Sequence, residues 1–84
     1  MEFAYTTKGT CSSKINFEIN DGKVYNVVYT SGCNGNLQGI GKLVEGMEVD
    51  EVITRLKGIR CGFKATSCPD QLATALIEAK EQIG

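Results

Sequence analysis

Hydrophobic and polar residues alternate in the first third of the chain. Ile15, Phe17 and Ile19 are separated by polar residues, which predicts a strand over 13–20 with one buried face and one solvated face. Asp21-Gly22 follows directly and is a strong signal for a tight hairpin turn. This stretch is therefore predicted to begin an antiparallel hairpin.

The partner strand of the hairpin is predicted over 23–30, in the run KVYNVVYT. Its apolar residues fall on both faces of an ideal strand, so we expect it to be the central strand of a small antiparallel sheet. Residues 2–7 are rich in aromatic and β-branched residues and predict one further short strand.

The hydrophobic period changes to three and four residues in the second half of the chain, which is typical of amphipathic helices. Helices are predicted over 35–45, over 48–57 and from Ser67 toward the end of the chain. The residues expected to face the core are Leu37, Ile40, Leu43, Val44, Val49, Val52, Ile53, Leu56, Leu72, Ala75, Leu76, Ala79 and Ile83.

Local signals refine two of these helices. Ser67 is expected to be the N-cap of the last helix, with Pro69 in the first turn and Asp70 at the third position. Gly39 and Gly41 lie inside the first helix, where each glycine costs about 1 kcal/mol relative to alanine. We therefore expect close packing or a local irregularity there.

Together the elements predict an α+β fold, with a small antiparallel sheet of about three strands followed by three helices packed on one face. The expected organisation is a single domain over 1–84. A core of 84 residues is small, and domains of this size often use a metal ion or disulfides as a staple.

Composition narrows the class of protein. The chain is 42% hydrophobic and 23% charged, which is typical of a folded domain, and its net charge of −1 gives no general signal for nucleic-acid binding. No apolar run is long enough to cross a membrane. Glu2 and a strand-like stretch follow Met1 instead of a secretory leader, so we expect a cytoplasmic protein.

The four cysteines are the main candidates for chemistry: Cys11, Cys33, Cys61 and Cys68. All are expected at the ends of secondary-structure elements, and Cys33 and Cys68 precede or begin helices, where a thiolate is stabilised. The chain has no histidine, which excludes mixed Cys/His zinc sites and histidine-dependent catalytic dyads and triads.

Four thiolates predict a structural zinc site, although the C-x-x-C pairs of zinc ribbons are missing. An iron–sulfur cluster uses the same ligands, and a disulfide or redox switch also fits the composition. A further alternative is that the cysteines are small, buried and inert. No catalytic residue is predicted.

Four basic residues surround Cys61 in the sequence: Arg55, Lys57, Arg60 and Lys64. They could offset the negative charge of a zinc–thiolate centre, or bind a phosphate or nucleotide. The glycine-rich run at 32–42 does not match a phosphate-binding loop, because Leu43 stands where Ser or Thr is required.

Three motifs carry a resemblance to a known family. Gly32-Cys33-x-Gly35-Asn36, Gly58-Ile59-x-Cys61-Gly62 and Thr66-Ser67-Cys68-Pro69-Asp70 resemble the TSCPD domain family, in its short, free-standing branch with four cysteines. The resemblance covers essentially the whole chain and identifies Cys11, Cys33, Cys61 and Cys68 as the family's cysteines.

A related domain stands at the C-terminal end of cobalamin-dependent ribonucleotide reductases, and short family members often carry a ribonucleoside-diphosphate reductase label. The resemblance therefore implies a link to nucleotide metabolism and DNA synthesis, with a ribonucleotide reductase as an expected protein partner. A chain of 84 residues cannot form the large catalytic barrel of such enzymes. We expect a zinc-binding accessory module, with a thiol-redox or iron–sulfur carrier and an interaction module with inert cysteines as alternatives.

Overall fold

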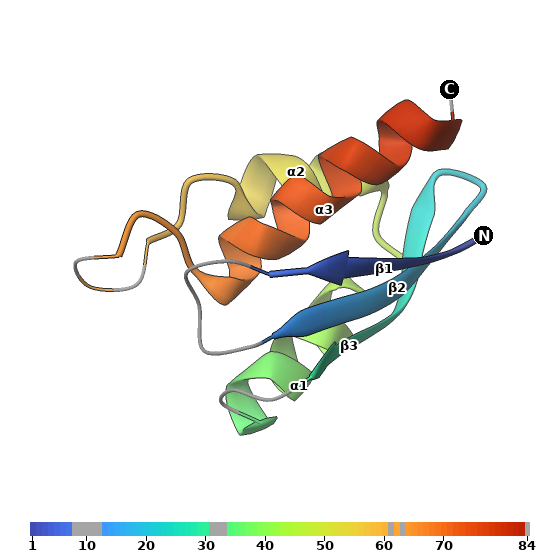
Figure 1. The fold of residues 1–84 in the computed structure, drawn as a ribbon. Helices are drawn as coiled ribbons and strands as arrows, with labels where there is room; N and C mark the ends of the chain where they lie inside the picture. Colours follow the sequence, from blue (N-terminus) through green and yellow to red (C-terminus); the bar gives the residue numbers. More distant parts are fainter. Residues whose placement is uncertain (8–12, 31–33, 61, 63, 84) are drawn as a thin grey trace.

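The computed structural model describes residues 1–7, 13–30, 34–60, 62 and 64–83. Three strands precede three helices along the chain (Figure 1). The strands are β1 (Glu2–Thr6), β2 (Lys14–Asn20) and β3 (Lys23–Thr30), and the helices are α1 (Asn34–Val44), α2 (Val49–Leu56) and α3 (Cys68–Ile83). The predicted α+β fold class is confirmed. No helix in these ranges is long and apolar enough to cross a membrane.

The three strands form one antiparallel sheet in the order β1-β2-β3. The predicted hairpin is confirmed, since Asp21 and Gly22 have φ values of 53° and 75°, as a tight type I′ connection requires. The prediction that the strand over 23–30 is central was wrong: β2 is the central strand, and β3 lies at an edge.

A bulge explains why β3 looked like a central strand. Asn26 has a positive φ of 54°, and the register with β2 shifts at this point. A bulge adds one residue to one strand and so inverts the inward–outward alternation beyond it. Val24 therefore faces the core before the bulge, while Val27 and Tyr29 pack against the core after it. Val24, Val27 and Tyr29 therefore share the inner face, whereas Val28 lies on the other face and is 58% exposed.

The outer edge of β3 is covered by the segment that links α1 to α2. The Val24 amide donates to the Met47 carbonyl (2.9 Å), and the Gly46 amide donates to the Val24 carbonyl (2.7 Å). One carboxylate oxygen of Glu45 accepts a hydrogen bond from the Asn26 amide (2.9 Å). These contacts satisfy backbone groups that an edge strand would otherwise expose.

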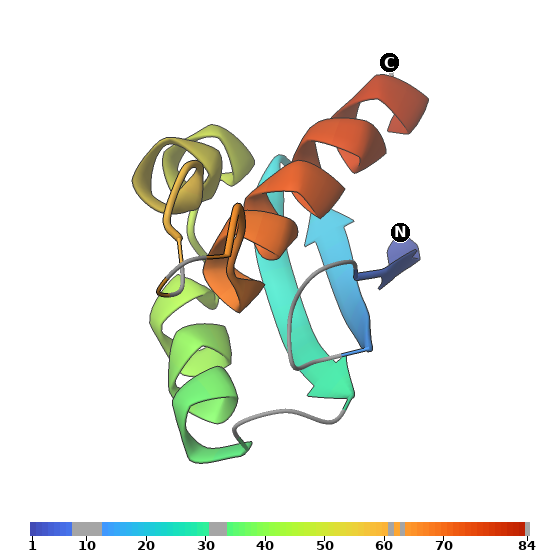
Figure 2. The ribbon, with the colours of Figure 1, turned by 60° about the vertical axis from the view of Figure 1, so that its left-hand side comes forward.

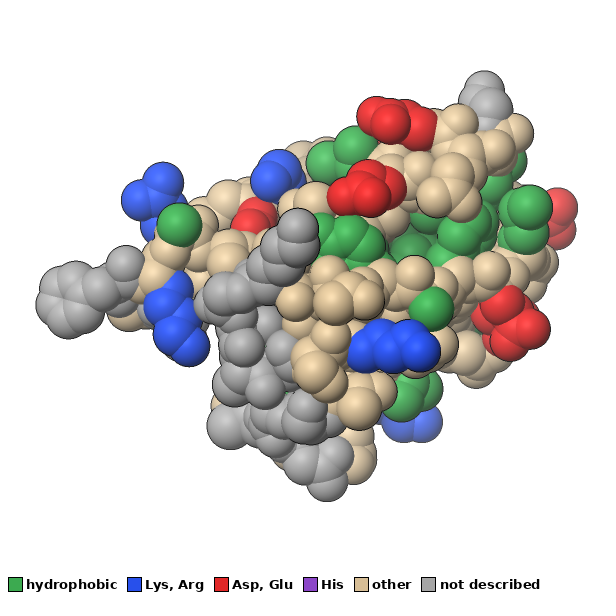
Figure 3. Space-filling view, in the orientation of Figure 1, with side chains coloured by type: hydrophobic (Ala, Val, Ile, Leu, Met, Phe, Trp, Pro, Cys, Tyr) green, Lys and Arg blue, Asp and Glu red, His purple; other side chains and the backbone are tan. Residues whose placement is uncertain are grey.

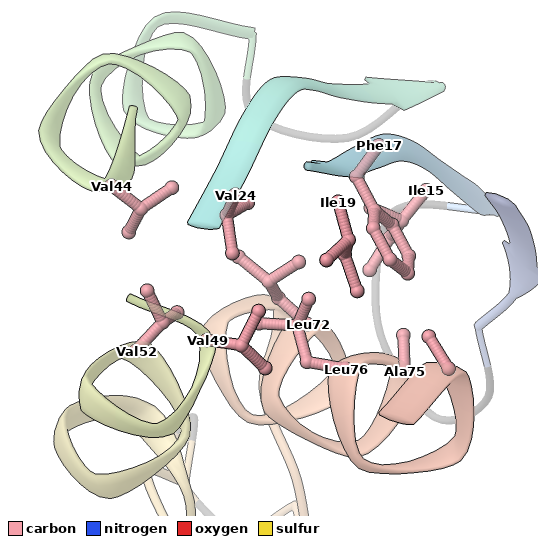
Figure 4. Close-up of a cluster of buried hydrophobic side chains, with 11 residues drawn as sticks. Ile15, Phe17, Ile19, Val24, Val44, Val49, Val52, Leu72, Ala75 and Leu76 are labelled. Atoms are coloured by element: carbon pink, nitrogen blue, oxygen red, sulfur yellow. The ribbon is translucent and has the colours of Figure 1, made fainter. Parts of the chain in front are cut away.

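The core lies between the sheet and α3 (Figure 4), with α2 packed on α3 and α1 running along β3 (Figure 2). Predicted core positions on β2, α2 and α3 are largely confirmed. Two were wrong: the side chain of Leu43 is 79% exposed, and that of Ile83 is 49% exposed. On a helix, Leu43 is about 240° around the axis from Leu37, which places it away from the face that Leu37 and Val44 share.

At Gly41, α1 lies close to the backbone of β3. A Cβ atom at this position would lie 2.8 Å from the carbonyl oxygen of Val27, whereas a Cβ at Gly39 would meet nothing within 4 Å. The expected close packing is therefore confirmed at Gly41 and not at Gly39.

Alanine substitutions at these two glycines should change stability in opposite directions. Gly41→Ala is expected to destabilise the protein by about 1–2 kcal/mol, because the clash exceeds the gain in helix propensity. Gly39→Ala is expected to stabilise it by about 0.5–1 kcal/mol. Urea unfolding followed by circular dichroism measures both, and a shift of the two midpoints in the same direction would contradict the packing described for Gly41.

Candidate functional site

The start of α3 joins two segments of the chain through Ser67. The Ser67 hydroxyl accepts a hydrogen bond from the Asp70 amide (3.2 Å), which confirms the predicted N-cap. The same hydroxyl donates to the carbonyl of Ile59 (2.6 Å). One buried side chain therefore caps the helix and fixes the loop that follows α2.

Asp70 has a different role from the one its position predicts. In a capping box, the residue at the third helical position would reach back to the N-cap amide. Here the buried Asp70 carboxylate accepts hydrogen bonds from the Gly58 amide (2.7 Å) and from the Thr66 hydroxyl. The Lys57 ammonium lies 3.6 Å from the same carboxylate. Asp70 thus ties both ends of the 57–66 segment to α3.

The ionisation of Asp70 follows from these contacts. Burial by itself would raise the pKa of this carboxyl, but hydrogen bonds from Thr66 and Gly58 and the charge of Lys57 outweigh it. The net result is a pKa below the ordinary value for aspartate. Asp70 is therefore held as a carboxylate at neutral pH.

Cys68 is the first residue of α3 and is buried, with 7% of its surface exposed. Its carbonyl accepts a hydrogen bond from the hydroxyl of Tyr29 (3.0 Å), which joins the end of β3 to the start of α3. Burial, and then the charge of the neighbouring Cys68, raise the pKa of Tyr29. The tyrosine therefore remains a neutral hydrogen-bond donor.

A third link lies where β1 ends, β2 begins and β3 ends. The Ser13 amide and hydroxyl both donate to the Thr30 carbonyl (2.9 and 3.3 Å), and the Thr7 amide donates to the Ser13 carbonyl (3.2 Å). Thr7 and Ser13 are the described residues on either side of positions 8–12. The ends of these strands are thus joined to one another and, through Tyr29, to α3.

Of the predicted metal ligands, only Cys68 belongs to the described part of the chain. Cys11, Cys33 and Cys61 lie outside it, so their predicted convergence with Cys68 stays a prediction. Among the residues that the structure does describe, no group of three or more Cys, Asp or Glu side chains is placed to hold a metal ion.

The predicted basic cluster divides into two pairs. Arg55 and Lys57 are paired with carboxylates: Arg55 contacts Glu51 at 2.8 Å, and Lys57 contacts Asp70. Arg60 and Lys64 are exposed, and neither forms an ion pair with any described residue. The charge available to an anion or a thiolate centre is therefore concentrated on Arg60 and Lys64.

Sequence reasoning did not identify Asp70 and Tyr29 as the residues that join these segments. Asp70 comes close to Gly58 and Lys57 only in the folded protein, so no local sequence pattern indicates these contacts. Tyr29 lies in the run KVYNVVYT, whose strand propensity by itself indicates only packing in the sheet. Its hydroxyl gave a partial signal, because a buried tyrosine hydroxyl usually finds a polar partner.

The fold and the start of α3 define a small α+β domain in which a buried cysteine begins a helix that is tied to three other segments. The family model of the TSCPD domain matches residues 2–80, and the chain belongs to this family. No match was found among curated proteins or among solved structures.

Proposed function

We propose that Cys11, Cys33, Cys61 and Cys68 bind one structural metal ion, with zinc as the first candidate. In this proposal the domain is a cytoplasmic module associated with ribonucleoside-diphosphate reductase and nucleotide metabolism, and it is not catalytic by itself. The observation that carries it is the set of hydrogen bonds joining the segments that flank these cysteines.

The links lie close to all four cysteines along the sequence. Ser13 is two residues after Cys11, Thr30 is three residues before Cys33, and Ile59 is two residues before Cys61. Each residue of chain spans at most about 3.6 Å, so each thiol is within a short reach of its anchor. Ser13–Thr30, Tyr29–Cys68 and Ser67–Ile59 connect these anchors to one another or to the start of α3. This arrangement supports a common site.

The chemistry of the donor set fits zinc. Zn²⁺ is bound in closed structural sites by four thiolates, and a chain without histidine has no imidazole alternative. A four-thiolate centre carries a net charge of −2, to which exposed Arg60 and Lys64 would be attracted. In a reducing compartment such as the proposed cytoplasm, cysteines are more often ligands or reactive thiols than structural disulfides.

The link to ribonucleotide reduction rests on membership of the family and the resemblance described above. A phosphate or nucleotide near Arg55, Lys57, Arg60 and Lys64 stays a secondary prediction, with Arg60 and Lys64 as the more available pair. Co-precipitation of the protein with ribonucleotide reductase from the same cell tests the association separately from metal binding.

The metal proposal is tested by elemental analysis of protein purified under reducing conditions without added metal. We expect one zinc ion per chain, fewer than four titratable thiols in the native state, and all four after chelation and unfolding. Cobalt substitution should give the intense visible bands of tetrahedral thiolate coordination. Single Cys→Ser variants at the four positions should each lose metal, whereas Lys42→Ala, a change at an exposed non-ligand on α1, should retain it.

The same measurements separate the alternatives. Iron and acid-labile sulfide in anaerobically purified protein would favour an iron–sulfur carrier over a zinc module. The position of Cys68 at a helix N-terminus is compatible with either centre. A protein with no metal and four thiols that titrate in the native fold would overturn the proposal. Cys→Ser variants that bind no metal and all stay folded would favour an interaction module with inert cysteines.

A further inference from the structure

The outer edge of β1 presents a regular row of backbone hydrogen-bonding groups. β1 pairs with β2 in an antiparallel register that places Phe3 opposite Phe17 and Tyr5 opposite Ile15. The hydrogen-bonded pairs at the two ends are Met1–Ile19 and Thr7–Ser13. Hydrogen-bonded pairs recur at every second residue, so the odd-numbered residues of β1 bond to β2.

The even-numbered residues therefore direct their amides and carbonyls away from β2. These residues are Glu2, Ala4 and Thr6, and the side chains of all three are exposed. Among the described residues, none bonds to the backbone of these three positions. The strand also has no lysine, no proline and no register shift, which are three of the features that can protect an open edge.

The two edges of this sheet differ in how they are covered. The edge at β3 is covered by the 45–47 segment, whose hydrogen bonds reach Val24 and Asn26. β1 lies on the side of the sheet away from α1, where no described element pairs with it (Figure 2). An open, regular edge of this kind is a template on which another strand can pair.

The register of β1 is suited to a second copy of itself. In an antiparallel pair centred on Ala4, Ala4 faces Ala4 of the second copy and Glu2 faces Thr6. All of these residues carry outward-directed groups, so each pair can exchange both of its N–H···O=C bonds. No like charges face each other. We propose that the protein forms a two-fold symmetric dimer through β1, which joins the two sheets into one continuous sheet.

Side chains on the inner face favour the same pairing. Phe3 and Tyr5 are half-buried on the face that carries α3, and Phe3 stacks on Phe17 with ring centroids 5.5 Å apart. In the symmetric pair, Phe3 of one copy lies opposite Tyr5 of the other, and aromatic cross-strand pairs are stabilising. Hydrophobic surface is visible between α3 and β1 in Figure 3, and the second copy would extend it.

Ala4→Pro tests this interface directly. Proline removes the outward amide of residue 4 and places its ring on the open edge, but it breaks no β1–β2 hydrogen bond. Sedimentation equilibrium under reducing conditions should show a concentration-dependent dimer for the wild type. Ala4→Pro should raise the dimer dissociation constant at least about 100-fold, as expected for two lost hydrogen bonds and a clash. Ala4→Thr, which keeps the amide and suits a strand, should change it by less than about fivefold.

Amide hydrogen exchange gives a second readout that does not depend on the variants. In the monomer, the amides of Glu2, Ala4 and Thr6 should exchange rapidly while those of Phe3 and Tyr5 are protected. At dimer-forming concentrations all five should be protected. A wild type that stays monomeric up to millimolar concentration would overturn the proposal, as would a dimer that Ala4→Pro leaves intact in a folded protein. Neither outcome depends on the metal content of the protein.

Discussion

Asp70→Ala is expected to lower the free energy of unfolding by about 3 kcal/mol, because it leaves buried donors without their acceptor. The Gly58 amide and the Thr66 hydroxyl both donate to this carboxylate, and Lys57 lies beside it. A domain of this length has a total stability of about 4–13 kcal/mol, so the loss is a large fraction. Urea unfolding followed by circular dichroism measures it.

Asp50 provides the matched control for this substitution. Its carboxylate pairs with Lys80, but its side chain is 76% exposed and solvent competes with the ion pair. Asp50→Ala should therefore change stability by no more than about 0.5 kcal/mol. Equal losses for the two variants would show that the Asp70 contacts do not hold the 57–66 segment in place.

The contribution of Asp70 should also depend on pH in a defined direction. Its folded-state pKa lies below the unfolded value of about 3.9, so the contribution is fully present above that value. It is lost as the pH falls through the folded-state pKa. The difference in stability between the wild type and Asp70→Asn should therefore narrow below about pH 4 and stay constant from pH 5 to 7. A difference that widens in acid would contradict the direction of the shift.

The elements of the fold could be predicted from sequence because their signals are local. Alternation at Ile15, Phe17 and Ile19 and the Asp21-Gly22 turn defined the hairpin, and its observed ends lie within one residue of the predicted ranges. The order of the strands depends on pairing across the sheet, which no local pattern contains. The bulge at Asn26 made β3 look two-sided, and the central position was therefore assigned to the wrong strand.

The candidate site shows the same division between local and long-range information. Residue types and the helix-start motif indicated Ser67 as the N-cap and Cys68 as a candidate thiol ligand. Contacts between residues far apart in the sequence, such as Tyr29 with Cys68 or Gly58 with Asp70, depend on how the strand ends meet α3. Composition can therefore predict a set of thiol ligands, but only packing can bring the segments that carry them together.

Leu76→Ala is expected to destabilise the protein by about 3–4 kcal/mol, because it removes a side chain from the centre of the core and leaves a cavity. Leu76 is fully buried, and it belongs to the cluster in which α3 meets β2 and α2 (Figure 4). The rigid sheet on one side limits how far the core can collapse into the space. Urea unfolding should therefore show a lower midpoint with an unchanged slope.

Leu43 is the control for the same chemical change at an exposed position. Sequence periodicity assigned both leucines to the core, whereas the structure leaves 79% of Leu43 exposed. Leu43→Ala should therefore change stability by no more than about 0.5 kcal/mol. A loss comparable to that of Leu76→Ala would mean that the outward face of α1 is covered in solution. The pair of variants thus tests the rotation of α1 about its axis, which decides which of its residues face β3.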